Sequence, residues 1–276
     1  MSNTIKAVLI DISGTILVGK EEVPGAIKAL QRLQQQQNLK VLFLTNSSTS
    51  PAALLQQLRS AGFDESAIPN INSIMTSVSA TRNYLIQNKL RPYCLLEDDL
   101  IASEFNELDM NDPNCVVVGL APNKLNYQRL NEAYRLLAKL KSSSNGSSLP
   151  HLIAVSKATH FLDADRELSL GPGRFVSLLQ ESSDVTAHVL GKPSPNFYHE
   201  ALSVLGIDNV SQAVMIGDDV VGDIKGALDA GLGQAILVKT GKYTTGDENG
   251  SKTEGFLPTV TVDSIVEAVD YICSNC

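Results

Sequence analysis

Short, unbroken apolar runs recur along the chain and alternate with segments in which apolar residues return every three or four positions. Such runs are typical of strands buried on both faces of a parallel sheet, and the second spacing is typical of amphipathic helices. The pattern predicts strands at 7–10, 41–44, 92–96, 115–118, 152–155, 185–190, 213–216, 234–238 and 258–262. It predicts helices at 26–36, 51–61, 126–141, 175–181, 196–205 and 264–271, and a short strand followed by a helix within 74–87.

Alternating strands and helices predict an α/β fold with a parallel, Rossmann-like sheet. The chain of 276 residues is longer than one typical domain, and 43% hydrophobic and 19% charged residues are ordinary for a globular protein. The pattern changes character in the middle of the chain. We therefore predict a core made of 1–79 and 187–276, with 80–186 inserted as a second α/β domain. A polar stretch at 142–148 is predicted to be a surface loop inside that insertion.

The formal net charge of −8 argues against nucleic acid or an anionic membrane as the partner. A phosphorylated substrate is still compatible with this charge, because a metal ion and a local lysine reverse the field inside a cleft. The first residues carry no basic segment followed by an apolar one, and no apolar run is long enough to span a bilayer. The expected location is the cytoplasm, with the nucleus as a second compartment.

The cysteines fit a reducing compartment. Cys94 and Cys115 lie in apolar, strand-like segments, where they are expected to be small core residues. Cys273 and Cys276 form a C-x-x-C pair at the C-terminal end of the sequence. A redox pair normally opens a helix after a strand, so a structural interpretation is favoured here.

Polar residues that could bind a metal and a phosphate follow several of the predicted strands. They are Asp11, Thr45, Asn46, Lys192, Asp218 and Asp219. The carboxyl ends of parallel strands meet at one edge of a sheet, where α/β folds bind ligands. Mg²⁺ prefers oxygen ligands and typically binds through one or two carboxylates together with a substrate phosphate. Each residue alone also has a structural interpretation: Asp11 as a turn residue, Thr45 and Asn46 as a helix cap, and Lys192 as a surface lysine.

Four segments that contain these residues form a recognisable set. They are Asp11-Ile12-Ser13-Gly14-Thr15, Thr45-Asn46, Gly191-Lys192-Pro193 and Gly217-Asp218-Asp219 with Asp223. The set resembles the four motifs of the haloacid dehalogenase superfamily. Its order and spacing resemble the branch in which a large cap domain (type IIA) is inserted between the second and third motifs, and the resemblance covers nearly the whole chain.

The resemblance implies a Mg²⁺-dependent phosphatase that works through an aspartyl-phosphate. It implies that Asp11 is the nucleophile, and that Asp11, the carbonyl of Ser13, and Asp218 hold the metal. The implied phosphate-binding residues are Asp11, Ile12, Ser13, Thr45, Asn46 and Lys192. Asp219 and Asp223 would orient metal-bound water or Lys192 without touching the substrate themselves. The cap would cover the site and set substrate choice, with 156–158 as its expected substrate-facing loop.

One position departs from the superfamily pattern. Most of its phosphatases carry a second Asp two residues after the nucleophile as general acid and base, and here that residue is Ser13. We therefore expect small substrates whose leaving groups need little protonation, such as pyrophosphate and phosphoramidates. A small phosphorylated molecule or a phosphorylated side chain is the expected partner, with neither nucleic acid nor membrane, and a homodimer is compatible with the sequence. Two alternatives to an enzyme are a catalytically silent binding protein and a phospho-acceptor switch.

Overall fold

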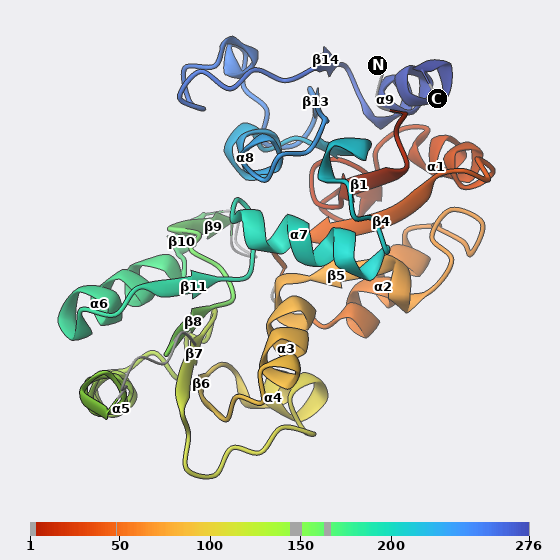
Figure 1. Cartoon of the computed structure of the whole chain (residues 1–276). Coiled ribbons are helices and arrows are strands. Elements are labelled where there is room, and N and C mark those ends of the chain that lie inside the picture. Colours follow the sequence, from red (N-terminus) through yellow and green to blue (C-terminus); the bar gives the residue numbers. More distant parts are fainter. Residues whose placement is uncertain (1–3, 48, 144–150, 163–166, 276) are drawn as a thin grey trace. The chain divides into compact units, whose positions relative to one another are not determined.

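A computed structural model describes residues 4–47, 49–143, 151–162 and 167–275 of the chain (Figure 1). The chain divides into two compact units. The core unit consists of Met1–Thr45, Pro51–Met75 and Lys192–Cys276, and the inserted unit of Asn46–Ser50 and Thr76–Gly191. The divisions thus fall after residues 75 and 191, whereas the sequence predicts them after 79 and 186. The first difference has a local cause, because the helix that starts at Ser77 is capped by the side chain of Thr76.

A six-stranded sheet forms the centre of the core unit, within the residues that are described. Its central strand β1 pairs in parallel with β12 on one side and β4 on the other, so that Leu9 lies between Met215 and Leu42. In spatial order the strands are β14 (Val260–Val262), β13 (Gln234–Val238), β12 (Ala213–Gly217), β1 (Ala7–Asp11), β4 (Lys40–Thr45) and β5 (Ile74–Thr76). The carboxyl ends of β1, β4, β12 and β13 therefore lie along the same edge.

Helices pack on the core sheet because successive strand residues point to opposite faces. Val8 and Ile10 join one apolar cluster with residues of three helices, and the alternate residue Leu9 is equally buried. The three helices are α1 (Ala26–Gln34), α2 (Pro51–Ser60) and α9 (Ile265–Asn275). The helix α8 (Gly226–Asp229) contacts β13, and α7 (Pro195–Val204) contacts α8. Strands with apolar residues on both faces, like Ala7–Ile10 of β1, are what such two-sided burial requires.

The inserted unit is a second parallel α/β layer structure. Its sheet has the order β11 (Ala187–Val189), β8 (Leu152–Ala154), β7 (Cys115–Val118) and β6 (Pro92–Leu95). One face forms a cluster with α3 (Ser77–Gln87) and α4 (Asp98–Glu104), and the other with α5 (Tyr127–Ser143) and α6 (Gly173–Ser183). Cys94 and Cys115 are buried in the first cluster, as predicted.

Two short hairpins were missed by the sequence pattern. In the core unit β2 (Leu17–Val18) pairs with β3 (Glu21–Glu22), and in the inserted unit β9 (His160–Leu162) pairs with β10 (Leu168–Leu170). Strands this short cannot display a period, so the apolar pattern does not reveal them. Short 3₁₀ segments at Ile71–Ser73, Val210–Gln212 and Asp247–Asn249 were missed for the same reason.

The predicted helices and strands otherwise agree with the structure in type and in place along the chain, but some of their ends are shifted. The strand predicted at 185–190 is confined to Ala187–Val189, and the last helix continues beyond 271 to Asn275. Most of the predicted loop at 142–148 and Cys276 lie outside the described residues, and Cys273 is a free, half-buried thiol. Among the helices of the described chain, none combines the length and apolar character needed to cross a membrane.

Candidate active site

The site begins where β1 ends, at Asp11. This carboxylate is only 5% exposed, and the chain turns immediately after it, with the amides of Thr15 and Ile16 donating to the carbonyl of Ile12. Gly14 in this turn has φ +91°, and a Cβ added there would lie 2.0 Å from Oδ2 of Asp218. The turn therefore requires glycine both for its backbone conformation and for space.

A second acidic segment follows β12, which ends at Gly217. The π-helical turn η3 (Val220–Lys225) leads the chain back, so that Oδ2 of Asp223 accepts from the amide of Asp219 at 3.1 Å. Asp219 in turn caps this segment, because its Oδ1 accepts from the amides of Val221 and Gly222. The Tyr198 hydroxyl, on α7, donates to the carbonyl of Gly222 at 2.5 Å. This loop is held from several sides, as expected for a π-helical turn near a functional site.

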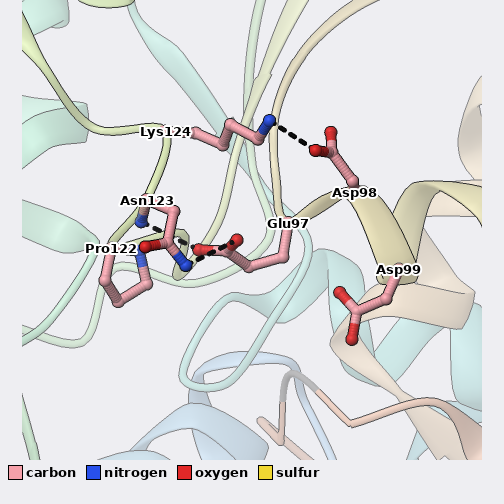
Figure 2. Close-up of a pocket in the computed structure, with 6 residues that line it drawn as sticks. All are labelled: Glu97, Asp98, Asp99, Pro122, Asn123 and Lys124. Atoms are coloured by element: carbon pink, nitrogen blue, oxygen red, sulfur yellow. Dashed lines mark hydrogen bonds and ion pairs between the residues drawn. The ribbon is translucent and has the colours of Figure 1, made fainter.

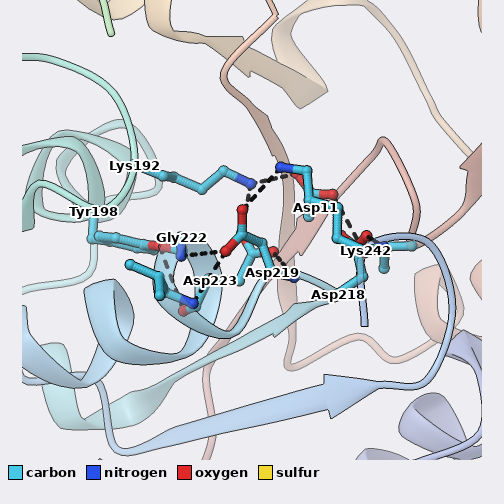
Figure 3. A network of polar contacts seen from close by, with 10 residues as sticks. Asp11, Lys192, Tyr198, Asp218, Asp219, Gly222, Asp223 and Lys242 are labelled. Carbon is cyan, nitrogen blue, oxygen red and sulfur yellow. Dashed lines mark hydrogen bonds and ion pairs between the residues drawn. The ribbon is translucent and has the colours of Figure 1, made fainter. Parts of the chain in front are cut away.

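Lys192 connects the two acidic segments. Its ammonium donates to Oδ1 of Asp11 and, at 2.6 Å, to Oδ1 of Asp223 (Figure 3). The lysine and both carboxylates are almost completely shielded from water. Thr15 adds a hydroxyl that lies 3.3 Å from Oδ2 of Asp11 and 3.4 Å from Oδ1 of Asp218. Residues from three separate parts of the core sequence, 11–15, 192 and 218–223, therefore meet at one point.

Burial dominates the electrostatics of this cluster. It raises the pKa of Asp218 to about 6 and that of Asp223 to about 7, and together with repulsion from Asp218 it raises the pKa of Asp11 despite the nearby Lys192. Repulsion from Asp223 also raises the pKa of Asp218. Burial acts to lower the pKa of Lys192, but the carboxylates of Asp11 and Asp223 together outweigh it and raise that pKa. Three buried carboxyl groups thus lie around one buried ammonium, and burial disfavours the ionised form of each.

This donor set fits a hard divalent cation. One carboxylate oxygen from each of Asp11, Asp218 and Asp223 lies within 4.8 Å of the others. Oxygen donors with uncompensated negative charge are what Mg²⁺ selects, and a cation among them would stabilise their ionised forms. Lys192 occupies Oδ1 of both Asp11 and Asp223, but Oδ2 of Asp223 also accepts from the amide of Asp219. Asp11 and Asp218 are therefore the stronger candidates for direct contact with the ion.

A further part of the site was missed by sequence reasoning. After β13 the chain reads Lys239-Thr240-Gly241-Lys242, and the Lys242 amide donates to Oδ2 of Asp218 at 2.6 Å. The Lys242 ammonium lies 2.9 Å from Oδ2 of Asp219. Burial would raise the pKa of Asp219, but Lys242 and the Gly222 amide outweigh it and lower that pKa. The signal was present, because this segment also follows a buried parallel strand at the same edge.

The other predicted site residues divide between the two units. Thr45 ends β4 and is buried in the core unit, whereas Asn46 belongs to the inserted unit. Ile12 is fully buried, and the side chain of Ser13 is exposed. In the predicted substrate-facing loop, Ser156 is buried and accepts from the amide of Ala158 at 3.1 Å, and Lys157 donates to Gln180 at 3.2 Å. Their roles toward a substrate stay predictions.

The inserted unit contains another group of acidic residues, around an open hollow of about 670 Å³ (Figure 2). Glu97 accepts from the backbone amide and side-chain amide of Asn123 at 3.0 and 3.2 Å. Asp98 pairs with Lys124 at 2.6 Å, and Figure 2 draws no hydrogen bond or ion pair from Asp99 to the other five residues. Glu97 and Asp98 are thus each matched by a partner of their own, unlike the carboxylates around Lys192.

Comparison with known proteins identifies the family. Residues 8–111 match the family described as haloacid dehalogenase-like hydrolase, and residues 189–268 match a second family described as HAD-hydrolase-like. The chain is 42% identical over 272 residues to haloacid dehalogenase-like hydrolase domain-containing protein 2 of Bos taurus, covering 98% of this chain and 97% of that one. The chain belongs to the haloacid dehalogenase-like hydrolases.

Other proteins similar to this hydrolase include two that are named phosphatases. Phospholysine phosphohistidine inorganic pyrophosphate phosphatase of Homo sapiens is 36% identical over 278 residues, covering 98% of this chain and 95% of that one. Among solved structures, NagD from E. coli K-12 has a TM-score of 0.79 at 25% identity and covers 96% of this chain and 98% of its own. The p-nitrophenyl phosphatase from Archaeoglobus fulgidus shares the fold, with a TM-score of 0.81, 24% identity, and coverage of 97% and 99%. The predicted superfamily, its enzyme class and the α/β fold with an inserted cap are confirmed.

Proposed function

We propose that this hydrolase is a Mg²⁺-dependent phosphatase that works through an aspartyl-phosphate on Asp11. The observation that carries the proposal is the buried contact of Lys192 with both Asp11 and Asp223, beside Asp218. A group of buried carboxylates that share one ammonium is costly to the fold unless a ligand compensates it. A cation together with a phosphate group would supply both the missing positive charge and an anion for Lys192.

Covalent catalysis would divide the reaction into two displacements. In the first, a carboxylate oxygen of Asp11 forms a bond to phosphorus while the bond to the leaving group breaks, and the leaving group takes the electron pair. In the second, water attacks the same phosphorus, the bond to Asp11 breaks, and phosphate and the free carboxylate are produced. Asp11 suits this role because it lies at a strand end with its backbone fixed by the turn at 12–16.

The remaining residues of the cluster would neutralise charge and keep the reacting groups in position. Lys192 would neutralise the oxygens of the group being transferred, and its contact with Asp223 keeps it in place beside Asp11. Asp11, the Ser13 carbonyl and Asp218 would hold Mg²⁺, which supplies charge neutralisation that lets an anionic nucleophile approach a phosphate. Asp219 would keep the turn of η3 in shape, since it accepts from two amides of that turn. Thr45 and Asn46 would contact phosphate oxygens.

The substrate class follows from Ser13, whose hydroxyl is not an acid at neutral pH. The relative that is 36% identical is named for phospholysine, phosphohistidine and inorganic pyrophosphate. We propose that this chain likewise favours pyrophosphate and phosphoramidates over phosphate esters of alcohols. Pyrophosphate releases phosphate, a weakly basic leaving group, and an amine or imidazole can be protonated before it leaves. An alkoxide needs an acid in the transition state, and general acid catalysis is worth roughly 10²–10⁴-fold.

Phosphate release from leaving groups of graded basicity tests the proposal, in wild type and in Ser13→Asp, with and without Mg²⁺. We expect Mg²⁺-dependent rates that fall steeply as the leaving group becomes more basic. In Ser13→Asp the dependence should flatten, because a carboxylic acid then stands at the position of the general acid. A wild-type enzyme that cleaves alkyl phosphates as fast as pyrophosphate would contradict the proposed substrate class.

A binding protein without turnover is the second candidate, favoured by the same exposed Ser13. It would keep the affinity of the site for Mg²⁺ and phosphate but would not complete the second displacement. The two candidates differ in one measurement. An enzyme releases many phosphates per molecule, whereas a protein of the second kind would release none or stop after one.

A further inference from the structure

A short loop at 240–242, which follows β13, packs directly against the carboxylate of Asp218. The Lys242 amide donates to Oδ2 of Asp218 at 2.6 Å, and the Thr240 hydroxyl donates to the carbonyl of Gly14. Gly241 lies between these two contacts with φ +54°. The 240–242 loop therefore ties the end of β13 both to the turn after β1 and to the end of β12.

Two glycines lie close to one oxygen of Asp218. A Cβ added to Gly14 would lie 2.0 Å from Oδ2, and a Cβ added to Gly241 would lie equally close to the same atom. Backbone of both glycines therefore lies against Oδ2, and the Lys242 amide donates to the same oxygen. The other oxygen, Oδ1, instead faces the Thr15 hydroxyl at 3.4 Å, and that hydroxyl also lies 3.3 Å from Oδ2 of Asp11. Oδ1 is thus the oxygen of Asp218 on the side of the nucleophile.

We propose that the 240–242 loop is a positioning element that offers a single oxygen of Asp218 to the cation and thereby favours Mg²⁺ over Ca²⁺. The proposal rests on the metal dependence proposed above. Mg²⁺ requires near-octahedral geometry with short bonds to single oxygens, whereas Ca²⁺ accepts more ligands and often takes both oxygens of one carboxylate. A carboxylate whose second oxygen is held by backbone suits the first ion and not the second.

The test compares Gly241→Ala with a matched control, Gly19→Ala. Gly19 has a similar backbone conformation, φ +62°, but a Cβ there would meet nothing within 4 Å. Dissociation constants for Mg²⁺ and for Ca²⁺ are measured by isothermal titration calorimetry on the substrate-free protein, with thermal melts to establish that each variant is folded. We expect the preference for Mg²⁺ over Ca²⁺ to fall by about 10-fold or more in Gly241→Ala, as for the loss of other groups that orient metal ligands. Gly19→Ala should keep the wild-type preference.

Variants of Thr240 give a second measurement that does not depend on whether Gly241→Ala folds. Thr240→Val removes the hydroxyl that anchors the loop to Gly14 while it keeps the side-chain shape, and Thr240→Ser restores the hydroxyl. We expect the Mg²⁺ preference to fall in Thr240→Val and to return in Thr240→Ser. If wild type binds Mg²⁺ but Thr240→Val and a folded Gly241→Ala keep its preference, the loop proposal alone is overturned. A wild-type protein that binds neither ion would overturn the proposed metal dependence as well.

Discussion

Two groups of acidic side chains occur at strand ends in this protein, one in each compact unit, and they differ in how their charge is compensated. In the inserted unit Glu97 and Asp98 follow β6, and Asn123 and Lys124 each contact one of them. Asp98 is 81% exposed, so water screens its charge as well. In the core unit Asp11 and Asp223 share Lys192, and all are nearly inaccessible to water.

The difference shows which feature of an acidic cluster indicates chemistry. An exposed carboxylate that has its own partner contributes little to the free energy of unfolding, because water screens the pair. Carboxylates that are buried with too few cations carry a desolvation cost that is not returned within the protein. Such an arrangement is typical of sites that bind a ligand or carry out a reaction. Burial and a deficit of positive charge, more than the number of acidic residues, therefore distinguish the core cluster.

The largest expected effect is on the rate of phosphate release, which should depend on the core cluster and not on the acidic group of the inserted unit. Asp11→Asn should lower the rate of phosphate release by about 10⁴-fold or more, because an amide cannot replace a carboxylate nucleophile. Asp98→Asn, the same chemical change in the inserted unit, should leave the rate close to wild type. Steady-state phosphate release on pyrophosphate measures both. A rate near wild type in Asp11→Asn would exclude Asp11 as the nucleophile.

The second comparison concerns the two lysines. Lys192→Met leaves buried carboxylates without their ammonium, so the free energy of unfolding should fall by about 3–5 kcal/mol. Lys124→Met breaks a pair with an exposed aspartate and should cost about 1 kcal/mol or less. Urea unfolding of both variants in metal-free buffer measures the difference. Equal costs would mean that burial does not distinguish the two sites.

The smallest effect is a pH dependence of stability that Mg²⁺ should reverse. The pKa of Asp218 is about 6 in the folded chain against an ordinary value of 3.8, so the folded state binds this proton more tightly than the unfolded state. The metal-free protein should therefore lose stability as pH rises from about 4 to about 6, by about 3 kcal/mol for a shift of about two pH units.

Mg²⁺ binds the ionised carboxylates, so the rise in melting temperature that it produces should be larger at pH 7 than at pH 5. Asp218→Asn should reduce both the pH dependence and the effect of Mg²⁺, since the amide has no proton to lose and is a weaker ligand. Melting temperatures across this pH range, with and without Mg²⁺, measure both effects. A Mg²⁺ effect of the same size at both pH values would contradict the assignment of Asp218.

Much of the core fold could be predicted from the sequence because its strands are buried on both faces. An apolar run such as 7–10, closed by Asp11, indicates both the strand and the point where it reaches the edge of the sheet. The same rule led to Asp218 and predicted that the two would meet, and they do. The short hairpins, such as Leu17–Val18 with Glu21–Glu22, could not be predicted, because their pairing depends on contacts and not on a period.

The sequence alone determined the order of the elements, the family motifs and the candidate residues at strand ends, since these depend on local pattern. Only the tertiary structure decided which charges are compensated. It brought Lys192 between Asp11 and Asp223, and it brought the Lys242 amide to Oδ2 of Asp218. These contacts join residues far apart along the chain, and their strength depends on burial, which no local pattern records. Desolvation and distance, both properties of the folded core, convert a set of acidic residues into a site.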